Sequence, residues 1–225
     1  VGPRIALAAN INGDKGQGKI ANTAEEGRIM VRIAKAEGYD FIKLYSKLNI
    51  ETYNAIIDEA HKQGLKTIGH IPNAFEGKLE QAFVPHFGMV AHAEQFSKHS
   101  ENFSIEDAQK FAKLSKDNGT YLSPTLTTMV WIANQTNSID SIKNSPTLKY
   151  VHPLLQSKWL TANNYNKNFT VKNLSYLEEM VKFHFLLVKV FKDAGVPIIA
   201  GTDAGVSGVV AGFSLHDELE LLVQA

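Results

Sequence analysis

The stretch DFIKLYSKLNIETYNAIIDEAHKQGLKTIGHI (residues 40–71) decides the fold, because it holds one complete strand–helix–strand unit. The β-branched and apolar runs Phe41–Tyr45 and Thr67–Ile71 each predict a strand. Between them, Asn49 is a typical N-cap residue, which predicts a helix over Ile50–Gln63. Two strands joined by a crossover helix are expected to lie parallel in one sheet.

The same alternation extends along the rest of the chain. Four further strand-like runs are Arg4–Ala8, Met89–Ala93, Tyr121–Leu126 and Pro197–Gly201. Apolar periodicity and capping residues predict further helices at Thr23–Glu37, Phe75–Phe83, Ser104–Asp117 and Val171–Ala194. The repeated βα units predict an α/β protein with a parallel sheet, in which residues 1–225 form one domain.

Residues 127–170 interrupt this pattern. They are rich in Asn, Ser and Thr and contain both tryptophans of the chain, Trp131 and Trp159. Long connections in compact domains often carry function. We therefore interpret residues 127–170 as an insertion after a strand, and as a candidate lid or pocket wall.

The composition excludes several classes of protein. The 23 basic residues balance 23 acidic ones, and no basic run forms a nucleic-acid-binding patch. No apolar run is long enough for a membrane span, and the first residues do not resemble a signal peptide. Without cysteine, the chain has no disulfide, thiolate nucleophile or Cys-ligated zinc. The cellular compartment stays open.

Four predicted strands carry a metal-competent or ionisable residue near the carboxyl end: Lys43, His70, His92 and Asp203. Side chains alternate along a strand, so Lys43 shares a face with Phe41 and Tyr45. The same alternation places His70 with Ile68, His92 with Val90, and Asp203 with Ile199 and Gly201. In a parallel barrel all four would face the interior at the end where barrel enzymes keep their active sites.

Each of these residues also has a structural explanation. A histidine in an apolar strand is often a hydrogen-bonded core residue, and an aspartate after Gly-Thr often caps a turn. Lys43 is harder to explain, because a lysine buried between Ile and Leu is costly unless it is paired, uncharged or chemically used. The matching positions of all four favour a functional site.

Motifs in this order resemble the amidohydrolase superfamily, in its imidazolonepropionase-like and Xaa-Pro dipeptidase-like branch. The motifs are DFIKLY (40–45), GHIP (69–72), VAHAEQF (90–96), SPTL (123–126), AGTDAG (200–205) and LHDELELLVQA (215–225). The resemblance covers nearly the whole chain. It implies a (β/α)8 TIM barrel of the metal-dependent hydrolase type, represented here by about strands three to eight, with Arg4–Ala8 as strand three.

The resemblance also implies the chemistry. Lys43 would be the carboxylated lysine that bridges two divalent metal ions, usually zinc. His70 and His92 would ligate the second metal, and imidazole nitrogen suits zinc. Asp203 would ligate the first metal and act as general base and then general acid towards a metal-activated hydroxide. The implied reaction is cleavage of an amide C–N bond in a small molecule such as a dipeptide or N-acyl amino acid.

The chain departs from the family in one respect. The His-x-His motif of strand one is absent, since no two of the eight histidines lie two positions apart. Strands one and two and the small β-sandwich of the family are missing too. We interpret the chain as an internal piece of a longer enzyme that is inactive without the remainder of the same chain. A shortened relative is less consistent with the open sheet edges that it would expose.

Other features leave alternatives open. Tyr45 follows Lys43 on the same face and is a candidate substrate contact, as is His216 at the start of the last predicted helix. One alternative function is a mononuclear-metal deaminase or cyclic amidase of the same fold. Another is a non-catalytic, barrel-based binding protein. The substrate, the number of metal ions and a homo-oligomeric state are not fixed by the sequence.

Overall fold

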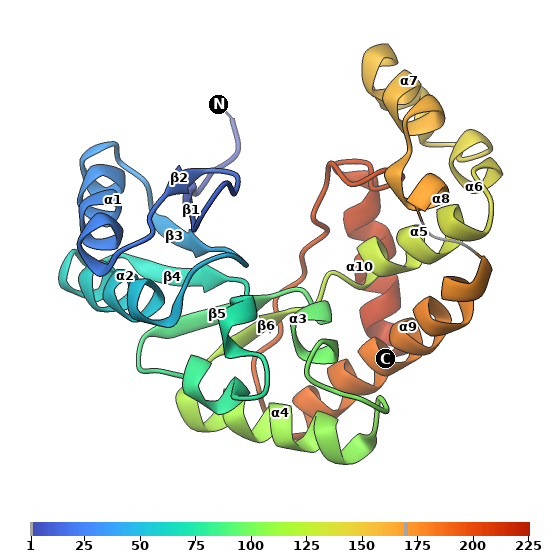
Figure 1. Cartoon of the computed structure of the whole chain (residues 1–225). Helices are drawn as coiled ribbons and strands as arrows, with labels where there is room; N and C mark the ends of the chain where they lie inside the picture. The colour runs from blue at the N-terminus through green and yellow to red at the C-terminus, as the bar shows by residue number, and fades with distance from the viewer. Residues whose placement is uncertain (1, 169–170) are drawn as a thin grey trace.

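The computed structural model describes residues 2–168 and 171–225, and its centre is a parallel sheet of six strands. The strands lie in the order β2-β1-β3-β4-β5-β6 (Figure 1). Their bounds are β1 Ala8–Asn12, β2 Lys19–Ile20, β3 Phe41–Leu44, β4 Lys66–Gly69, β5 Phe87–Ala91 and β6 Tyr121–Ser123. Beyond β6, a parallel bridge between Leu122 and Ile198 continues the sheet. The predicted parallel α/β architecture is confirmed.

The helices α1, α2 and α4 lie along one face of the sheet, whereas α5 to α8 and α10 lie to one side of it (Figure 1). Their bounds are α1 Ala24–Ala36, α2 Ile50–Lys62, α3 Glu94–Ser97, α4 Ile105–Asn118, α5 Leu126–Asn137, α6 Asp140–Lys143, α7 Pro153–Thr161, α8 Asn164–Asn168, α9 Val171–Asp193 and α10 Phe213–Gln224. Short 3-10 helices lie at η1 Asn73–Phe75, η2 Leu79–Ala82 and η3 Leu148–Tyr150. None of the helices described is long and apolar enough to cross a membrane.

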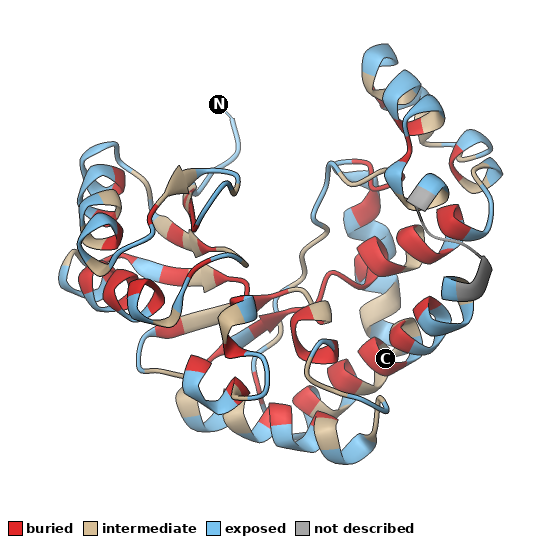
Figure 2. Ribbon diagram, viewed as in Figure 1, coloured by how far each residue is buried: buried red, intermediate tan, exposed pale blue. Residues whose placement is uncertain are grey.

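The register of the sheet separates a buried face from a partly open one. One row of paired residues consists of Leu44, Gly69, Val90 and Leu122. Its three large side chains are fully buried against the helices in the main core, where Figure 2 shows the buried residues gathered. The adjacent row consists of Lys43, Ile68, Met89 and Tyr121. Its side chains point to the opposite face, which would line the inside of a barrel.

Capping explains where the outer helices begin. Thr23 and Glu26 form a capping box on α1, and the Asn49 side chain accepts the N–H of Thr52 on α2. Ser104 accepts the N–H of Asp107 and so caps α4. The Asp107 carboxylate accepts a hydrogen bond from the Ser100 hydroxyl at 2.6 Å. Ser104 is therefore the N-cap of α4, and Asp107 holds Ser100 in place.

Several predicted boundaries were wrong. The first strand begins at Ala8, where Arg4–Ala8 was predicted to be the strand, and β2 was not predicted. Pro197–Gly201 is reduced to the bridge at Ile198. The predicted helix Phe75–Phe83 is two 3-10 turns, because Gly77 between them has a left-handed φ of +70°.

The segment interpreted as an insertion is helical. Residues 127–168 form most of α5, then α6, η3, α7 and α8, while residues 169 and 170 lie outside the described part of the chain. Two small clusters of buried side chains hold the segment together, one of which includes Trp159. Helix α5 packs against α9, and α9 packs against α4. The segment is thus attached to the helical layer by its own packing.

Gly69 allows β4 to end close to β3. Its φ is +126°, and a Cβ atom at this position would overlap the backbone of Leu44. The next residue, His70, donates its N–H to the Leu44 carbonyl at 2.9 Å. Only glycine fits this conformation and this contact.

We therefore expect the substitution Gly69→Ala to lower the free energy of unfolding by about 2–4 kcal/mol, through backbone strain and overlap. Gly64 is a matched control, because its φ is +68° and no atom lies within 4 Å of its Cβ position. Gly64→Ala should cost only about 1 kcal/mol. Chemical denaturation of the two variants measures the difference, and equal losses would contradict the close approach at Gly69.

His184 is a buried histidine in the core between α9 and α3. It is fully buried, and its Nε2 lies 2.6 Å from the hydroxyl of Ser97. Burial lowers the pKa of His184 from 6.5 to about 3. The folded protein therefore keeps this ring neutral at pH values where the unfolded chain binds a proton.

Stability is consequently expected to fall as the pH drops from 6.5 towards 3. The contribution of His184 is about 1.4 kcal/mol per pH unit in this window. His184→Gln keeps a hydrogen-bonding group beside Ser97 but does not titrate. The free energy of unfolding of this variant, measured against pH, should decline less steeply than that of the wild type by this amount. Parallel curves would show that His184 is not neutral in the fold.

Candidate active site

A cavity of about 190 Å³ lies at the carboxyl ends of the strands. Five of the six residues predicted from the sequence line it: Lys43, Tyr45, His70, His92 and Asp203. The other lining residues are Glu94, Thr125, Thr128, Met129, Ile132, Tyr165 and Val206. The fold therefore brings residues separated by up to 160 positions to one place, as expected for the carboxyl end of a parallel barrel.

Lys43 enters the cavity from β3. Its neighbours Ile42 and Leu44 are fully buried on the helical face, so the strand directs Lys43 to the opposite face as predicted. The Lys43 Nζ lies 5.6 Å from the centre of the Tyr45 ring. Lys43 makes no ion pair with any residue in the described part of the chain. A half-buried amine that lies beside an aromatic ring and forms no ion pair with the described residues is available for chemistry.

His70 follows Gly69 at the end of β4. Its Nδ1 lies 2.8 Å from the Ser46 hydroxyl, and its ring stacks on Tyr45 with 4.2 Å between ring centres. Its Nε2 is buried and has no hydrogen-bond partner among the described residues. Burial, helped by the neighbouring His92 and Lys43, lowers the pKa of His70 to about 2. The imidazole is thus neutral. Burial of Nε2 without a hydrogen-bond partner costs free energy, which a bound ligand would recover.

His92 has the same arrangement at the end of β5. Its Nδ1 lies 2.9 Å from the hydroxyl of Thr125, and its ring is 5.0 Å from that of His70. Burial lowers the pKa of His92, although the nearby Asp203 opposes this shift. Both histidines are therefore held at Nδ1 by a hydroxyl group, as metal-ligating histidines are held by a second hydrogen bond.

The backbone conformation that directs the His92 side chain into the cavity differs from the prediction. Val90 was expected on the same face as His92, but it pairs with Gly69 and Leu122 in the buried row. Simple alternation from Val90 would point His92 at the helices. The strand ends at Ala91 instead, and His92 has a φ of +77°. This left-handed residue turns the ring back towards the cavity.

Asp203 lies in an irregular segment after the bridge at Ile198. Its side chain is exposed, and its charge influences the pKa values of His92, Tyr45 and Tyr165. Asp203 has a φ of +50° and Thr125 a φ of +51°. Together with His92, these are three left-handed, non-glycine residues around one cavity. Backbone conformations of this kind cost energy and are concentrated at functional sites.

The metal-binding capacity of the site is partial in this chain. Among residues 2–168 and 171–225, no group of three or more His, Asp or Glu side chains lies close enough to hold a metal ion. The two imidazoles nevertheless fit a metal, because both are neutral and each is fixed at Nδ1. Lys43 and Asp203 line the same cavity as further ligand candidates.

Three contributors were missed or only loosely indicated by the sequence. Ser46 and Thr125 hold the histidines, but a hydroxyl that contacts a distant side chain has no sequence signal. Tyr165 was only one of several aromatic residues considered for a pocket wall. Tyr165 lines the cavity with Asp203 and Glu94, and burial, followed by the charges of these two carboxylates, raises the pKa of Tyr165.

His216 is not brought to the cavity. It is exposed on α10 and is not among the described lining residues. The residue of α10 that approaches the site is Glu218, which is fully buried.

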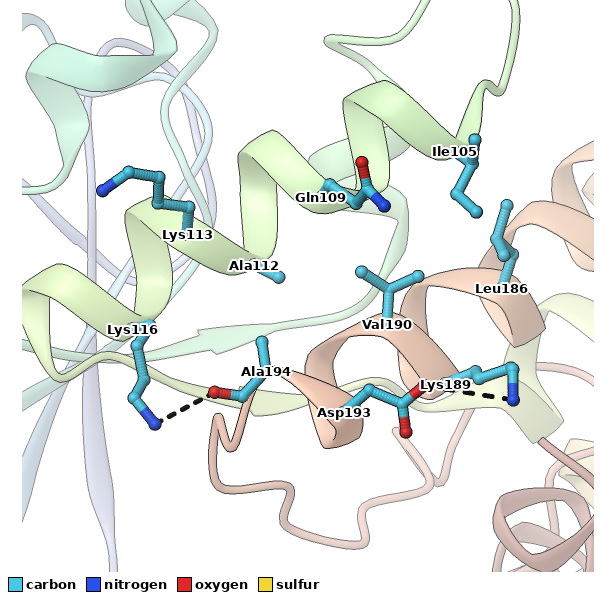
Figure 3. Close-up of a pocket in the computed structure, with 10 residues that line it drawn as sticks. All are labelled: Ile105, Gln109, Ala112, Lys113, Lys116, Leu186, Lys189, Val190, Asp193 and Ala194. Atoms are coloured by element: carbon cyan, nitrogen blue, oxygen red, sulfur yellow. Dashed lines mark hydrogen bonds and ion pairs between the residues drawn. The ribbon is translucent and has the colours of Figure 1, made fainter.

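A second hollow of about 500 Å³ lies between α4 and α9 (Figure 3). Its charged side chains form hydrogen bonds or ion pairs, including that of Lys113 with Asp117. Lys116 donates to the Ala194 carbonyl at 2.9 Å, and Lys189 pairs with Asp193 at 3.9 Å. This groove lies between the outer helices and contains none of the predicted site residues.

Comparisons with known proteins identify the fold. No protein-family model and no curated protein matches the sequence. Among solved structures, the chain is similar to a bottromycin amidohydrolase, with a TM-score of 0.71 and 21% identity over 95% of this chain and 49% of the other. It is also similar to a Xaa-Pro dipeptidase, with a TM-score of 0.54 and 19% identity over 94% of this chain and 46% of the other. For ochratoxinase from A. niger the TM-score is 0.57 and the identity 17%, over 97% and 43%.

Two of these neighbours are named for their hydrolytic activity, as an amidohydrolase and a dipeptidase. The chain therefore shares the fold of these solved structures, as part of a (β/α)8 barrel, which the sequence predicted. It spans about half the length of the solved structures that it matches.

Proposed function

We propose that the protein containing this chain hydrolyses an amide C–N bond of a small molecule at a metal centre built on Lys43, His70, His92 and Asp203. The observation that carries this proposal is the shared cavity, in which two neutral imidazoles are fixed by hydroxyl groups beside an unpaired lysine and an aspartate. The amide-hydrolysing neighbours with the same fold support the reaction class.

His70 and His92 would hold one metal ion through their Nε2 atoms. The buried Nε2 of His70 has no hydrogen-bond partner among the described residues. The hydroxyls of Ser46 and Thr125 fix the Nδ1 atoms of the two histidines. Lys43, once carboxylated, would present anionic oxygen atoms in place of a half-buried ammonium group. Divalent ions such as zinc, when bound, lower the pKa of water and polarise the scissile carbonyl.

Asp203 is the proposed proton carrier. Its carboxylate is exposed at the cavity, near the rings of His92 and Tyr165. From this position it can accept a proton from the attacking water and donate it to the departing amine nitrogen. The left-handed backbone at Asp203 holds the side chain towards the cavity without a regular strand.

The space beside Asp203 supports a small polar substrate. A cavity of about 560 Å³ adjoins the candidate active site and shares Tyr165, Asp203 and Val206 with it. Its wall includes Trp159 and Lys158, and Lys158 forms no ion pair in the described part of the chain. An aromatic wall and a free cation would suit a dipeptide or N-acyl amino acid with a terminal carboxylate.

A mononuclear centre in the same fold is the second candidate. The two imidazole rings support it, because they lie 5.0 Å apart and are each held at Nδ1, and a site with these ligands needs no carboxylated lysine. In that case His70 and His92 would bind a single metal ion, and Lys43 would stay an amine.

The first test counts metal ions and examines Lys43 in the full-length protein, purified with zinc and bicarbonate. We expect two zinc ions per chain and a carbon dioxide adduct on Lys43 by mass spectrometry. One zinc ion with an unmodified lysine would select the mononuclear centre. No bound metal would overturn the proposal.

Lys43→Gln should lower kcat/KM for amide hydrolysis by about a thousandfold, which corresponds to several kcal/mol of transition-state stabilisation. Lys47→Gln is the matched control, because Lys47 is an exposed residue near Asp14 and does not line the cavity. Its rate should be unchanged. An equal loss in both variants would indicate a general effect on the fold.

Tyr165→Ala should raise KM by about tenfold with little change in kcat, because an aromatic wall that contacts the substrate in both ground and transition states contributes uniform binding. Tyr150, which lies in the same segment but outside both cavities, provides the control Tyr150→Ala. Steady-state kinetics with an N-acyl amino acid would measure both. A fall in kcat alone would assign Tyr165 to the chemical step.

A further inference from the structure

Helix α10 places one carboxylate deep inside the protein, outside the cavity. Glu218 is fully buried. Its Oε1 accepts the N–H of Leu126 at 3.1 Å, and its Oε2 accepts the N–H of Thr127 at 2.8 Å. Leu126 and Thr127 begin α5, about ninety positions earlier in the chain. Burial raises the pKa of Glu218, and these N–H groups oppose the shift by stabilising its charged form.

Glu218 thereby caps a helix that lacks a cap of its own. The first N–H groups of any helix need acceptors, which an N-cap Thr or Ser side chain usually provides. In α5 the N-cap residue is Thr125, but its hydroxyl makes no capping hydrogen bond. A carboxylate at this end also interacts favourably with the helix dipole.

The hydroxyl of Thr125 is used elsewhere. It lies 2.9 Å from Nδ1 of His92. The backbone supports this contact, because the N–H groups of His92 and Ala93 donate to the carbonyls of Ser123 and Pro124 at 2.8 and 3.0 Å. If Thr125 capped α5, its hydroxyl would point to the N–H groups of α5 and leave His92.

We propose that Glu218 is a positioning residue for the site: it caps α5 in place of Thr125, so that the Thr125 hydroxyl fixes the Nδ1 atom of His92 and leaves Nε2 facing the cavity. The effect on metal binding rests on the proposed function above. The effect on the His92 ring does not, because it follows from hydrogen bonds within this chain.

A purely structural role for Glu218 predicts something different. In that case, removal of the cap would lower stability and leave the ring of His92 unchanged. The two roles are separated by observing the ring itself, in the metal-free full-length protein, through the ¹⁵N chemical shifts of histidine.

In the wild type, the contact with the Thr125 hydroxyl should hold the His92 ring in one environment and give one set of ¹⁵N shifts. In Glu218→Gln the side-chain NH2 opposes one backbone N–H, so the Thr125 hydroxyl is drawn back to α5 and the ¹⁵N shifts of His92 should change. Thr125→Val should give a similar change, whereas Thr125→Ser should preserve the wild-type spectrum. Glu220→Gln is the matched control, since Glu220 is exposed on the same helix and its carboxylate accepts a hydrogen bond from the Gln224 side chain.

Zinc affinity provides the second measurement. Loss of a hydrogen bond that supports a metal-ligating histidine typically weakens binding by about 10–100-fold. We expect Glu218→Gln and Thr125→Val each to weaken zinc binding within this range, and the double variant to be no weaker than Thr125→Val alone. This lack of additivity is expected if Glu218 acts through Thr125.

A wild-type His92 spectrum in Glu218→Gln would overturn the proposal, as would additive losses of zinc affinity. If Glu218→Gln does not fold, Glu218→Asp tests the same contacts, because it keeps the charge but withdraws it by one methylene group. A protein that binds no zinc and hydrolyses nothing would refute the proposed function alone, since the ¹⁵N measurement on His92 needs neither.

Discussion

The register between β3 and β4 is the constraint on which the site depends. Pairing Lys43 with Ile68 and Leu44 with Gly69 puts Lys43 on the inner face and buries Leu44 under the helices. His70 then lies where its backbone N–H donates to the Leu44 carbonyl. A shift of one residue would exchange the two faces and bury the lysine against the helices. The same register therefore builds the core and aims the functional side chains.

Beyond the register, the site is held by hydrogen bonds and backbone strain. Hydroxyl groups fix Nδ1 of both histidines, and left-handed residues turn His92 and Asp203 inwards. Each left-handed residue costs free energy, which the packing of the surrounding elements must supply. Such strain is retained where an alternative conformation would point the side chain away from the cavity.

Much of the fold could be predicted because local patterns decide it. Alternation in FIKLY and the cap at Asn49 are local, and both are confirmed. The first strand was misplaced because the run with Ile5 and Leu7 is more apolar than Ala8–Asn12. The sheet nevertheless pairs the latter with β3, and leaves Ile5 and Leu7 exposed. Partner choice is a property of the whole sheet and is not encoded in the apolarity of one run.

The site shows the same division. Lys43 and His70 follow from alternation, whereas His92 and Asp203 reach the cavity through left-handed residues that the sequence pattern does not indicate. The role of Glu218 could not be predicted, because the N–H groups that it accepts belong to residues 126 and 127, far away in the sequence. A buried carboxylate is expensive unless it accepts hydrogen bonds, and a helix start is expensive unless it donates them. Glu218 and the start of α5 therefore stabilise each other. The hydroxyl of the N-cap residue Thr125 is then not needed by the helix and can bind His92.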